Sequence, residues 1–171
     1  MGLERIRNIA RRKGAAIVES NGVVREANAP AGLGPHELPI ANRVVCAVSV
    51  SRFVPFLRLQ FWANVPESAP GPDYTLQIEG PIRIVTAKGE LNIDPQAGPD
   101  PAYLLLVTKT VAHALASDDG GLVVDFTDGD RLVVPPFEYE PWQLSGEDGS
   151  LFVSVAGGGL AVWDARPSDP E

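Results

Sequence analysis

One cysteine and one of the two histidines have side chains that could build a nucleophilic site. Cys46 and His113 fall at matching positions when the two halves of the chain are aligned, and each lies in an alternating apolar run. A histidine beside a thiol can activate it as a thiolate. However, no third residue can be named to orient the histidine, and a buried cysteine usually acts as a small hydrophobe. We therefore predict that both residues belong to the core, and we assign no catalytic residue.

The segment 137–142 suggests binding, because it interleaves aromatic side chains with carboxylates after a Pro-Pro break. Such a composition suits a ligand site or a protein interface. Large aromatic residues also fill cores, so the segment could instead fold over the open end of the domain with Trp142 as a plug. A ligand site at that open end would also include His113. The candidate binding residues are Glu138, Tyr139, Glu140, Trp142 and His113.

Five aspartates between residues 118 and 130 could supply oxygen ligands to calcium. Their spacing does not match the EF-hand loop, in which ligands recur at alternate positions before a terminal glutamate. The same aspartates form good turns with the glycines beside them, which predicts a solvated rim. One cysteine and two histidines also exclude a Cys₄ or Cys₂His₂ zinc site. We predict no metal site.

The glycine run 157–159 could present backbone N–H groups to an anion. Between two predicted strands, the run is more simply a turn or a bulge. No glycine cluster continues to the dinucleotide-binding spacing, and no Walker-type lysine follows one. The sequence therefore implies no cofactor.

The 171-residue chain has 14 Lys and Arg against 22 Asp and Glu, a formal net charge of −8. Only residues 1–13 are basic, so we expect no nucleic-acid binding by the main domain. No apolar run approaches the roughly 20 residues that a membrane span needs. The basic start is not followed by the apolar stretch of a secretory signal. These features predict a cytoplasmic protein without a membrane span.

Alternation of apolar and polar residues with a period of two dominates the chain and is typical of half-buried β-strands. The turns at Lys88-Gly89 and Asp128-Gly129 predict hairpins. Between the two regions, Asp100 can cap a helix that begins at Pro101 and has about two turns. The expected strands cover residues 44–51, 56–61, 76–78, 82–85, 91–93, 108–117, 122–127, 130–134, 142–144, 151–155 and 160–163.

The two halves of the chain resemble each other. Each half would form a four-stranded antiparallel sheet with an apolar face, and the second half supplies the partner for the first. We therefore predict a mainly β fold, a pseudo-duplicated antiparallel β-sandwich or partly open barrel. One short helix would lie between the halves, and an N-terminal helix is possible. The aligned pairs are 43–48 with 110–115, 56–61 with 121–126, 76–79 with 132–135, and 87–93 with 147–153.

The predicted organisation has three parts. Residues 1–37 form an N-terminal arm, and its basic segment 1–13 has apolar residues at a spacing that permits a helix. Residues 38–164 form a single β domain, whose halves span about 38–94 and 109–164. Residues 165–171 are a tail.

Three segments carry a family resemblance. They are residues 38–44, residues 119–129 and a C-terminal signature that contains Pro135-Pro136, Glu140-Pro141-Trp142 and the run from Gly157 to Trp163. Over about residues 38–164 the chain resembles a family of uncharacterised, mostly actinobacterial proteins known only as a domain of unknown function. The N-terminal arm and the proline-rich loop after Trp62 depart from its pattern. The resemblance implies the β unit and no reaction, ligand or site residue.

Two functions fit this sequence. The first is a non-enzymatic interaction module that binds a protein partner, or itself to form a homo-oligomer, through a sheet edge or the aromatic-acidic loop. Antiparallel sandwiches leave edges that pair readily. The alternative is a small-molecule binder or enzyme with its site at the open end of the β domain. A filled core with a flat face favours the first, and a concave cavity with converging polar groups favours the second.

Overall fold

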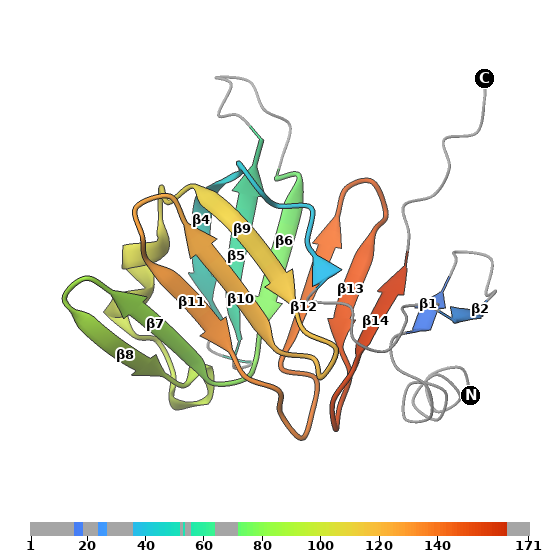
Figure 1. The fold of residues 1–171 in the computed structure, drawn as a ribbon. Coiled ribbons are helices and arrows are strands. Elements are labelled where there is room, and N and C mark those ends of the chain that lie inside the picture. The colour runs from blue at the N-terminus through green and yellow to red at the C-terminus, as the bar shows by residue number, and fades with distance from the viewer. Residues whose placement is uncertain are drawn as a thin grey trace.

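The computed structural model describes residues 16–18, 24–26, 36–51, 53, 56–63 and 72–163. They form two β-sheets packed as a sandwich with little helix, as the alternation predicted (Figure 1). The basic segment 1–13, with its possible helix, and the tail 165–171 lie outside the described residues. Within the part that is described, no helix has the length and apolar character to cross a membrane.

The described residues contain fourteen strands and two 3-10 helices. The first half contains β4 (Val44–Val50), β5 (Leu57–Trp62), β6 (Tyr74–Ile78), β7 (Ile82–Thr86) and β8 (Gly89–Ile93). The connection between the halves contains η1 (Pro95–Ala97) and η2 (Pro101–Leu106). The second half contains β9 (Val111–Ala116), β10 (Leu122–Phe126), β11 (Arg131–Val134), β12 (Trp142–Gly146), β13 (Leu151–Ser154) and β14 (Leu160–Trp163).

Three short strands precede the first half. They are β1 (Ala16–Val18), β2 (Val24–Glu26) and β3 (His36–Glu37). β1 pairs with β14 in parallel, and β2 then extends the same sheet. β3 pairs with β9 at one edge of the other sheet. The eight-stranded sheet has the order β2-β1-β14-β13-β12-β6-β5-β4, and the six-stranded sheet has the order β3-β9-β10-β11-β7-β8.

The halves share one topology but exchange their hairpins between the sheets. β4, β5 and β6 form a meander in the eight-stranded sheet, and the β7–β8 hairpin crosses to pair with β11. β9, β10 and β11 form the matching meander in the other sheet, and the β12–β13 hairpin crosses back to pair with β6. The predicted duplication is therefore confirmed, since β13-β12-β6-β5-β4 matches β8-β7-β11-β10-β9. The prediction of one sheet for each half is wrong, because the halves are intertwined.

The match between the halves is clearest where β4 and β9 begin, at the point where a bridge joins the two sheets. The N–H of Asn42 donates to the carbonyl of Val111 at 2.8 Å, and the N–H of Thr108 donates to that of Val45 at 2.9 Å. Asn42 and Thr108 are also the two non-glycine residues with positive φ in the described chain, at 62° and 69°. Residue 42 thus corresponds to residue 108, and the predicted alignment of these two strands is wrong by one residue.

Alternating side chains of both meanders fill the space between the sheets. β5 and β10 bury every second residue, and a phenylalanine ends the buried row of each strand, Phe61 and Phe126. Leu38 and Ile40, which precede β4, are also completely buried, so this segment belongs to the core. Most buried apolar side chains form one large cluster, and Val155 and Ala161 form a small second cluster.

The connection between the halves follows its predicted capping. Asp100 accepts a hydrogen bond from the N–H of Ala102 at 2.8 Å, and Pro101 opens the helix. The helix is a 3-10 helix of six residues. η1 begins in the same way, with Asp94 as its cap. Burial raises the pKa of Tyr103 in η2 to about 12.

Candidate functional site

The aromatic-acidic loop connects β11 to β12 and is largely exposed. Phe137 and Tyr139 pack edge to face with their ring centroids 4.6 Å apart, and Tyr139 keeps 42% of its surface exposed. Glu138 and Glu140 are both exposed. Glu140 borders a recess of about 40 Å³, which has room only for water. The other residues around this recess are Gln77, Glu79, Trp142 and Gln143.

Trp142 lies in the core with only 1% of its surface exposed. Its indole N–H donates to the carbonyl of Gly120 at 2.9 Å, and the hydroxyl of Ser154 donates to the same oxygen at 2.8 Å. A buried indole needs such an acceptor, so this contact fixes the ring where it closes one end of the sandwich. The buried position of Trp142 agrees with the interpretation that this residue is a plug in the core and not part of a binding surface.

Cys46 and His113 lie in different sheets, so they do not form a dyad. His113 is exposed on the outer face of the six-stranded sheet, opposite Asp125. The thiol of Cys46 donates to the carbonyl of Gln60 at 3.2 Å, and burial raises its pKa. The prediction that both residues belong to the core is wrong, because a bulge after Val45 and a matching bulge in β9 reverse the alternation.

The aspartates between residues 118 and 130 bind partners within the protein. Asp118 contacts His36, Asp119 caps its own turn, and Asp125 forms a two-pronged ion pair with Arg131. Throughout the described residues, no three or more His, Cys, Asp or Glu side chains are grouped as metal ligands. The predicted turn thus accounts for Asp119, whereas Asp118 and Asp125 pair with side chains on β3 and β11.

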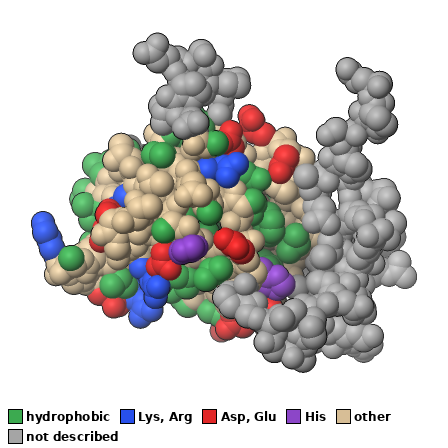
Figure 2. All heavy atoms as spheres, turned by 45° about the horizontal axis from the view of Figure 1, so that its top comes forward, with side chains coloured by type: hydrophobic (Ala, Val, Ile, Leu, Met, Phe, Trp, Pro, Cys, Tyr) green, Lys and Arg blue, Asp and Glu red, His purple; other side chains and the backbone are tan. Residues whose placement is uncertain are grey.

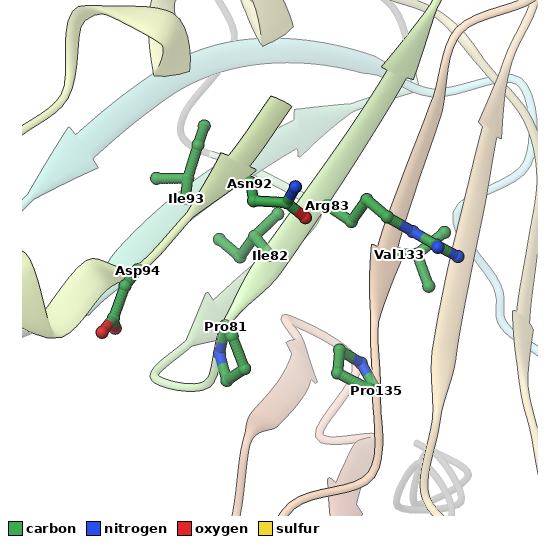
Figure 3. Close-up of a pocket in the computed structure, with 8 residues that line it drawn as sticks. All are labelled: Pro81, Ile82, Arg83, Asn92, Ile93, Asp94, Val133 and Pro135. Atoms are coloured by element: carbon green, nitrogen blue, oxygen red, sulfur yellow. The ribbon is translucent and has the colours of Figure 1, made fainter. Parts of the chain in front are cut away.

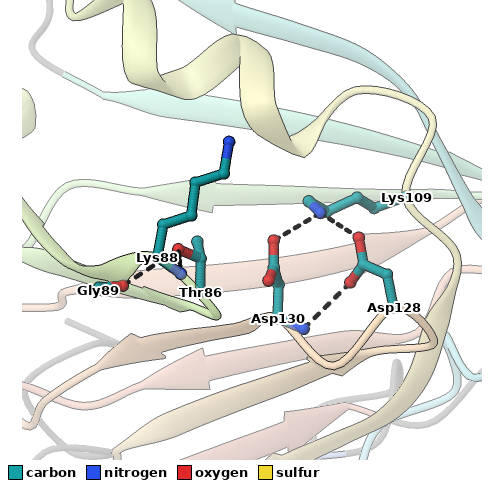
Figure 4. A network of polar contacts seen from close by, with 6 residues as sticks. All are labelled: Thr86, Lys88, Gly89, Lys109, Asp128 and Asp130. Atoms are coloured by element: carbon teal, nitrogen blue, oxygen red, sulfur yellow. Dashed lines mark hydrogen bonds and ion pairs between the residues drawn. The ribbon is translucent and has the colours of Figure 1, made fainter.

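Lys109 holds the remaining two aspartates at the end of the β10–β11 hairpin (Figure 4). Its ammonium contacts Asp128 and lies 2.7 Å from the carboxylate of Asp130. Burial opposes the charge, but these hydrogen bonds raise the pKa of Lys109, and the bond from Lys109 lowers the pKa of Asp128. Arg43, the residue that corresponds to Lys109, lies 3.4 Å from Asp73. The pair thus repeats in both halves, which indicates a structural role.

A larger recess occurs where the chain crosses from β3 to β4. It has a volume of about 530 Å³ and is widely open to solvent. Arg43 and Tyr74 line it, with the guanidinium 4.8 Å from the centre of the tyrosine ring. The Tyr74 hydroxyl donates to Asp148 at 3.1 Å, and burial raises its pKa. Both polar side chains are thus engaged by neighbouring residues of the fold.

A groove of about 390 Å³ crosses the outer face of the six-stranded sheet at its β8 side (Figure 3). Its floor follows one row of paired residues, Val133 on β11, Arg83 on β7 and Asn92 on β8. Val133 and Arg83 point outward because their neighbours along each strand are buried, and Asn92 points outward because it lies directly opposite Arg83. The groove is otherwise lined by Pro81, Ile82, Ile93, Asp94 and Pro135. It therefore combines apolar walls with a guanidinium, an amide and a carboxylate.

Among the described residues, no helix covers the outer face beside this groove (Figure 1). Leu115, Val123 and Val133 form a half-buried apolar row across β9, β10 and β11. The next row contains His113, Asp125 and Arg131. Hydrophobic, charged and histidine side chains accordingly alternate over the visible surface in Figure 2. Such a mixed, flat face suits contact with a macromolecule better than enclosure of a small one.

β8 borders the groove and is the outermost strand of its sheet in the described chain. Four of its five residues are exposed, Gly89 through Asn92. The pair Thr86–Gly89 closes a two-residue turn, so these two residues exchange backbone hydrogen bonds. Because such pairs alternate in an antiparallel ladder, the backbone groups of Glu90 and Asn92 point away from β7. The free edge therefore presents two donors and two acceptors.

Sequence reasoning named a sheet edge in general, but it did not identify β8 or the groove. Arg83, Asn92 and Val133 come from three strands, and each is an ordinary outward residue in its own alternation. Only the pairing of β7 with β11, across the two halves, brings them into one row. The single local signal for this edge is Leu91, which lies on a short strand with few other apolar residues. The structure shows that Leu91 is exposed.

Comparison with known proteins adds one result. No curated protein matches the chain, and no solved structure matches it. A family model matches residues 36–164, from the first residue of β3 to the residue after β14. This range contains the whole duplicated unit and agrees with the resemblance in the C-terminal signature. The chain belongs to DUF6188, a family of unknown function.

Proposed function

We propose that the protein is an interaction module that binds an extended segment of a protein by strand addition to β8. The added strand would take the backbone hydrogen bonds that Glu90 and Asn92 direct outward. Its side chains on one face would enter the groove beside Asn92. In this mode, backbone bonds supply affinity, and pockets for alternate side chains supply specificity.

One observation carries this proposal: the strand that corresponds to β8 already has the neighbour that β8 lacks. β8 matches β13 in the duplicated topology, and β13 pairs with β14 in antiparallel register along its whole length. An edge of the same geometry thus accepts a further strand in the other sheet. In the described chain, the place beside β8 that corresponds to β14 is empty.

The other long edge is less suited to this role. β4 ends the eight-stranded sheet, but Val45 exchanges backbone hydrogen bonds with Thr108 and Lys109, just before β9 begins. η2 packs against the same strand. β8 has neither cover and carries no proline, the residue that blocks edges by removing a donor.

The experiment compares two substitutions at one edge residue. Linear peptides are selected from a displayed random library against the immobilised full chain, and their affinities are measured by fluorescence anisotropy. Asn92→Pro removes the outward N–H without removing a bond to β7, whereas Asn92→Thr keeps that N–H. We expect Asn92→Pro to weaken peptide binding by about tenfold or more, because a hydrogen bond is lost and the added strand is blocked. Asn92→Thr should bind like the parent.

Circular dichroism of Asn92→Pro provides the folding control. The proposal fails if no linear peptide can be selected. It also fails if the selected peptides bind Asn92→Pro and the parent equally while Tyr139→Ala abolishes binding, because the aromatic-acidic loop would then be the binding surface.

The open recess lined by Arg43 and Tyr74 supports a second candidate, a small-molecule site at the end of the domain. The observation in its favour is the guanidinium held over an aromatic ring at a solvent-accessible surface. The guanidinium also lies 3.4 Å from Asp73, so a bound anionic compound would have to displace that carboxylate. Screening small carboxylates and phosphates by thermal shift, with Arg43→Gln as the matched variant, tests this candidate separately from strand addition.

A further inference from the structure

We infer that the strand that adds to β8 is β8 of a second copy of the protein. The two strands would run antiparallel, with the twofold axis at Leu91. This inference rests on the proposed strand addition and specifies its partner. The resulting dimer would have twofold symmetry, and each copy would use the same surface. Two six-stranded sheets would join edge to edge into one continuous sheet.

Backbone geometry allows this register. Glu90 and Asn92 present outward N–H and C=O groups, because the closing pair Thr86–Gly89 fixes which residues bond to β7. Pairing Glu90 with Asn92 of the second copy, and Asn92 with Glu90, satisfies all of these groups with four hydrogen bonds. Leu91 then lies opposite Leu91 of the second copy as a non-hydrogen-bonded pair. Side chains approach most closely in that type of pair.

The charges along the hairpin favour the same register. With the twofold axis at Leu91, Lys88 lies opposite Asp94 of the second copy, and each dimer contains this opposite-charge pair twice. Glu90 lies opposite the neutral amide of Asn92. Opposite charges across strands are stabilising, and like charges directly opposite are destabilising.

Shifting the axis by one residue removes this complementarity. An axis at Glu90 places the two glutamates directly opposite each other. An axis at Asn92 places Glu90 opposite Asp94. Both alternatives bring like charges together, so the sequence selects the register about Leu91.

Exposed apolar surface lies at the same edge. Leu91 keeps 40% of its surface exposed, although it lies opposite the fully buried Ile84 of β7. Dimerisation about Leu91 would withdraw part of this surface from water. The contact is short, so we expect a weak dimer that depends on concentration.

Sedimentation equilibrium of the full chain over a wide concentration range is the first test. We expect a reversible monomer–dimer equilibrium, with Asn92→Pro weakening the dimer by about tenfold or more and Asn92→Thr leaving it unchanged. A parent protein that stays monomeric at its highest soluble concentration overturns the inference. The selected peptides would still bind in that case, so the proposed function is judged separately.

A charge exchange tests the register. Lys88→Asp and Asp94→Lys should each weaken self-association by about tenfold or more, because each homodimer would contain two like-charge pairs. A mixture of the two variants should regain dimers, since all opposing pairs in the mixed dimer have opposite charge. Circular dichroism verifies the fold of each variant, and Asp94→Ala, which removes the cap without adding a positive charge, controls for loss of the η1 cap. A dimer that forms in the parent but is insensitive to these changes overturns the register.

Discussion

Thr108 is held in a backbone conformation that its side chain disfavours, and relief of that strain should stabilise the protein. Its φ is 69°, a left-handed value that is unusual for a β-branched residue. The residue that corresponds to it, Asn42, has φ 62° and is of a type that tolerates this region. Thr108→Asn therefore gives the second half the residue type that the first half already has at the equivalent position, residue 42.

The expected magnitude comes from the conformation. An L-residue loses about 1–2 kcal/mol in the left-handed region, and asparagine recovers much of this. Thr108 is exposed, and its N–H bond to Val45 involves only the backbone, so the substitution removes no buried packing. We expect Thr108→Asn to raise the free energy of unfolding by about 1 kcal/mol. For a chain of this length, that corresponds to about 2–4 °C in Tm.

Urea denaturation followed by far-ultraviolet circular dichroism measures the effect. The reverse substitution, Asn42→Thr, should lower the free energy of unfolding by a similar amount. Thr110→Asn is the matched control, because Thr110 has an ordinary φ and gains no relief. If Thr108→Asn and Asn42→Thr both leave stability unchanged, the two positive-φ residues are not strained, and this reasoning is refuted.

Three other changes test the packing and the charges. Trp142→Phe removes an indole hydrogen bond in the core and should cost about 1–3 kcal/mol in chemical denaturation, whereas an unchanged midpoint would contradict the plug. Gly80→Ala would bring its new carbon to 2.7 Å from Pro141 Cβ, so we expect a loss of about 1–3 kcal/mol unless the loop yields. The hydrogen bond from Lys109 lowers the pKa of Asp128 in the folded protein below its ordinary value of 3.8. This carboxylate therefore stabilises the fold above pH 3.8, and the stabilisation is lost as the pH falls through the lowered folded-state pKa. Lys109→Met should therefore flatten the acid side of a plot of Tm against pH, and an unchanged slope would refute the pairing.

Local features of the fold were predictable from the sequence because they depend on neighbouring residues. The Asp128-Gly129 turn and the capped helix at Asp100 depend only on residues close to them in the chain, and both occur as predicted. Alternation of apolar and polar residues in the sequence likewise identified β5, β6 and β10, in which every second residue is buried. Alternation shows that one face of a strand is buried, but it does not show which sheet the strand joins. The exchange of hairpins between the halves could therefore not be predicted from the alternation.

The bulges explain the errors at Cys46 and His113. Val45 and Val48 both face the core although they are three residues apart, because the bulge between them inserts an extra residue. Val111 and Ala114 are related in the same way in β9. A continuous period of two across each bulge puts Cys46 and His113 on the wrong face. Bulges have no reliable local signature in these strands, so the error arises from geometry that only the paired strand reveals.

The duplication also explains why the β8 edge is the place proposed for strand addition. The two halves share one topology, so the equivalent edges at β8 and β13 have equivalent backbone geometry. Any difference in how these two edges are covered therefore reflects the path of the chain after each hairpin. After β13 the chain returns as β14 and caps that edge, whereas after β8 it leaves through η1 and η2 toward β9. The edge at β8 thus stays open because its chain connects the halves. Its open backbone groups, the groove beside Asn92 and the opposite charges of Lys88 and Asp94 lie together at that one edge, and this coincidence makes the β8 edge the first place to search for a partner.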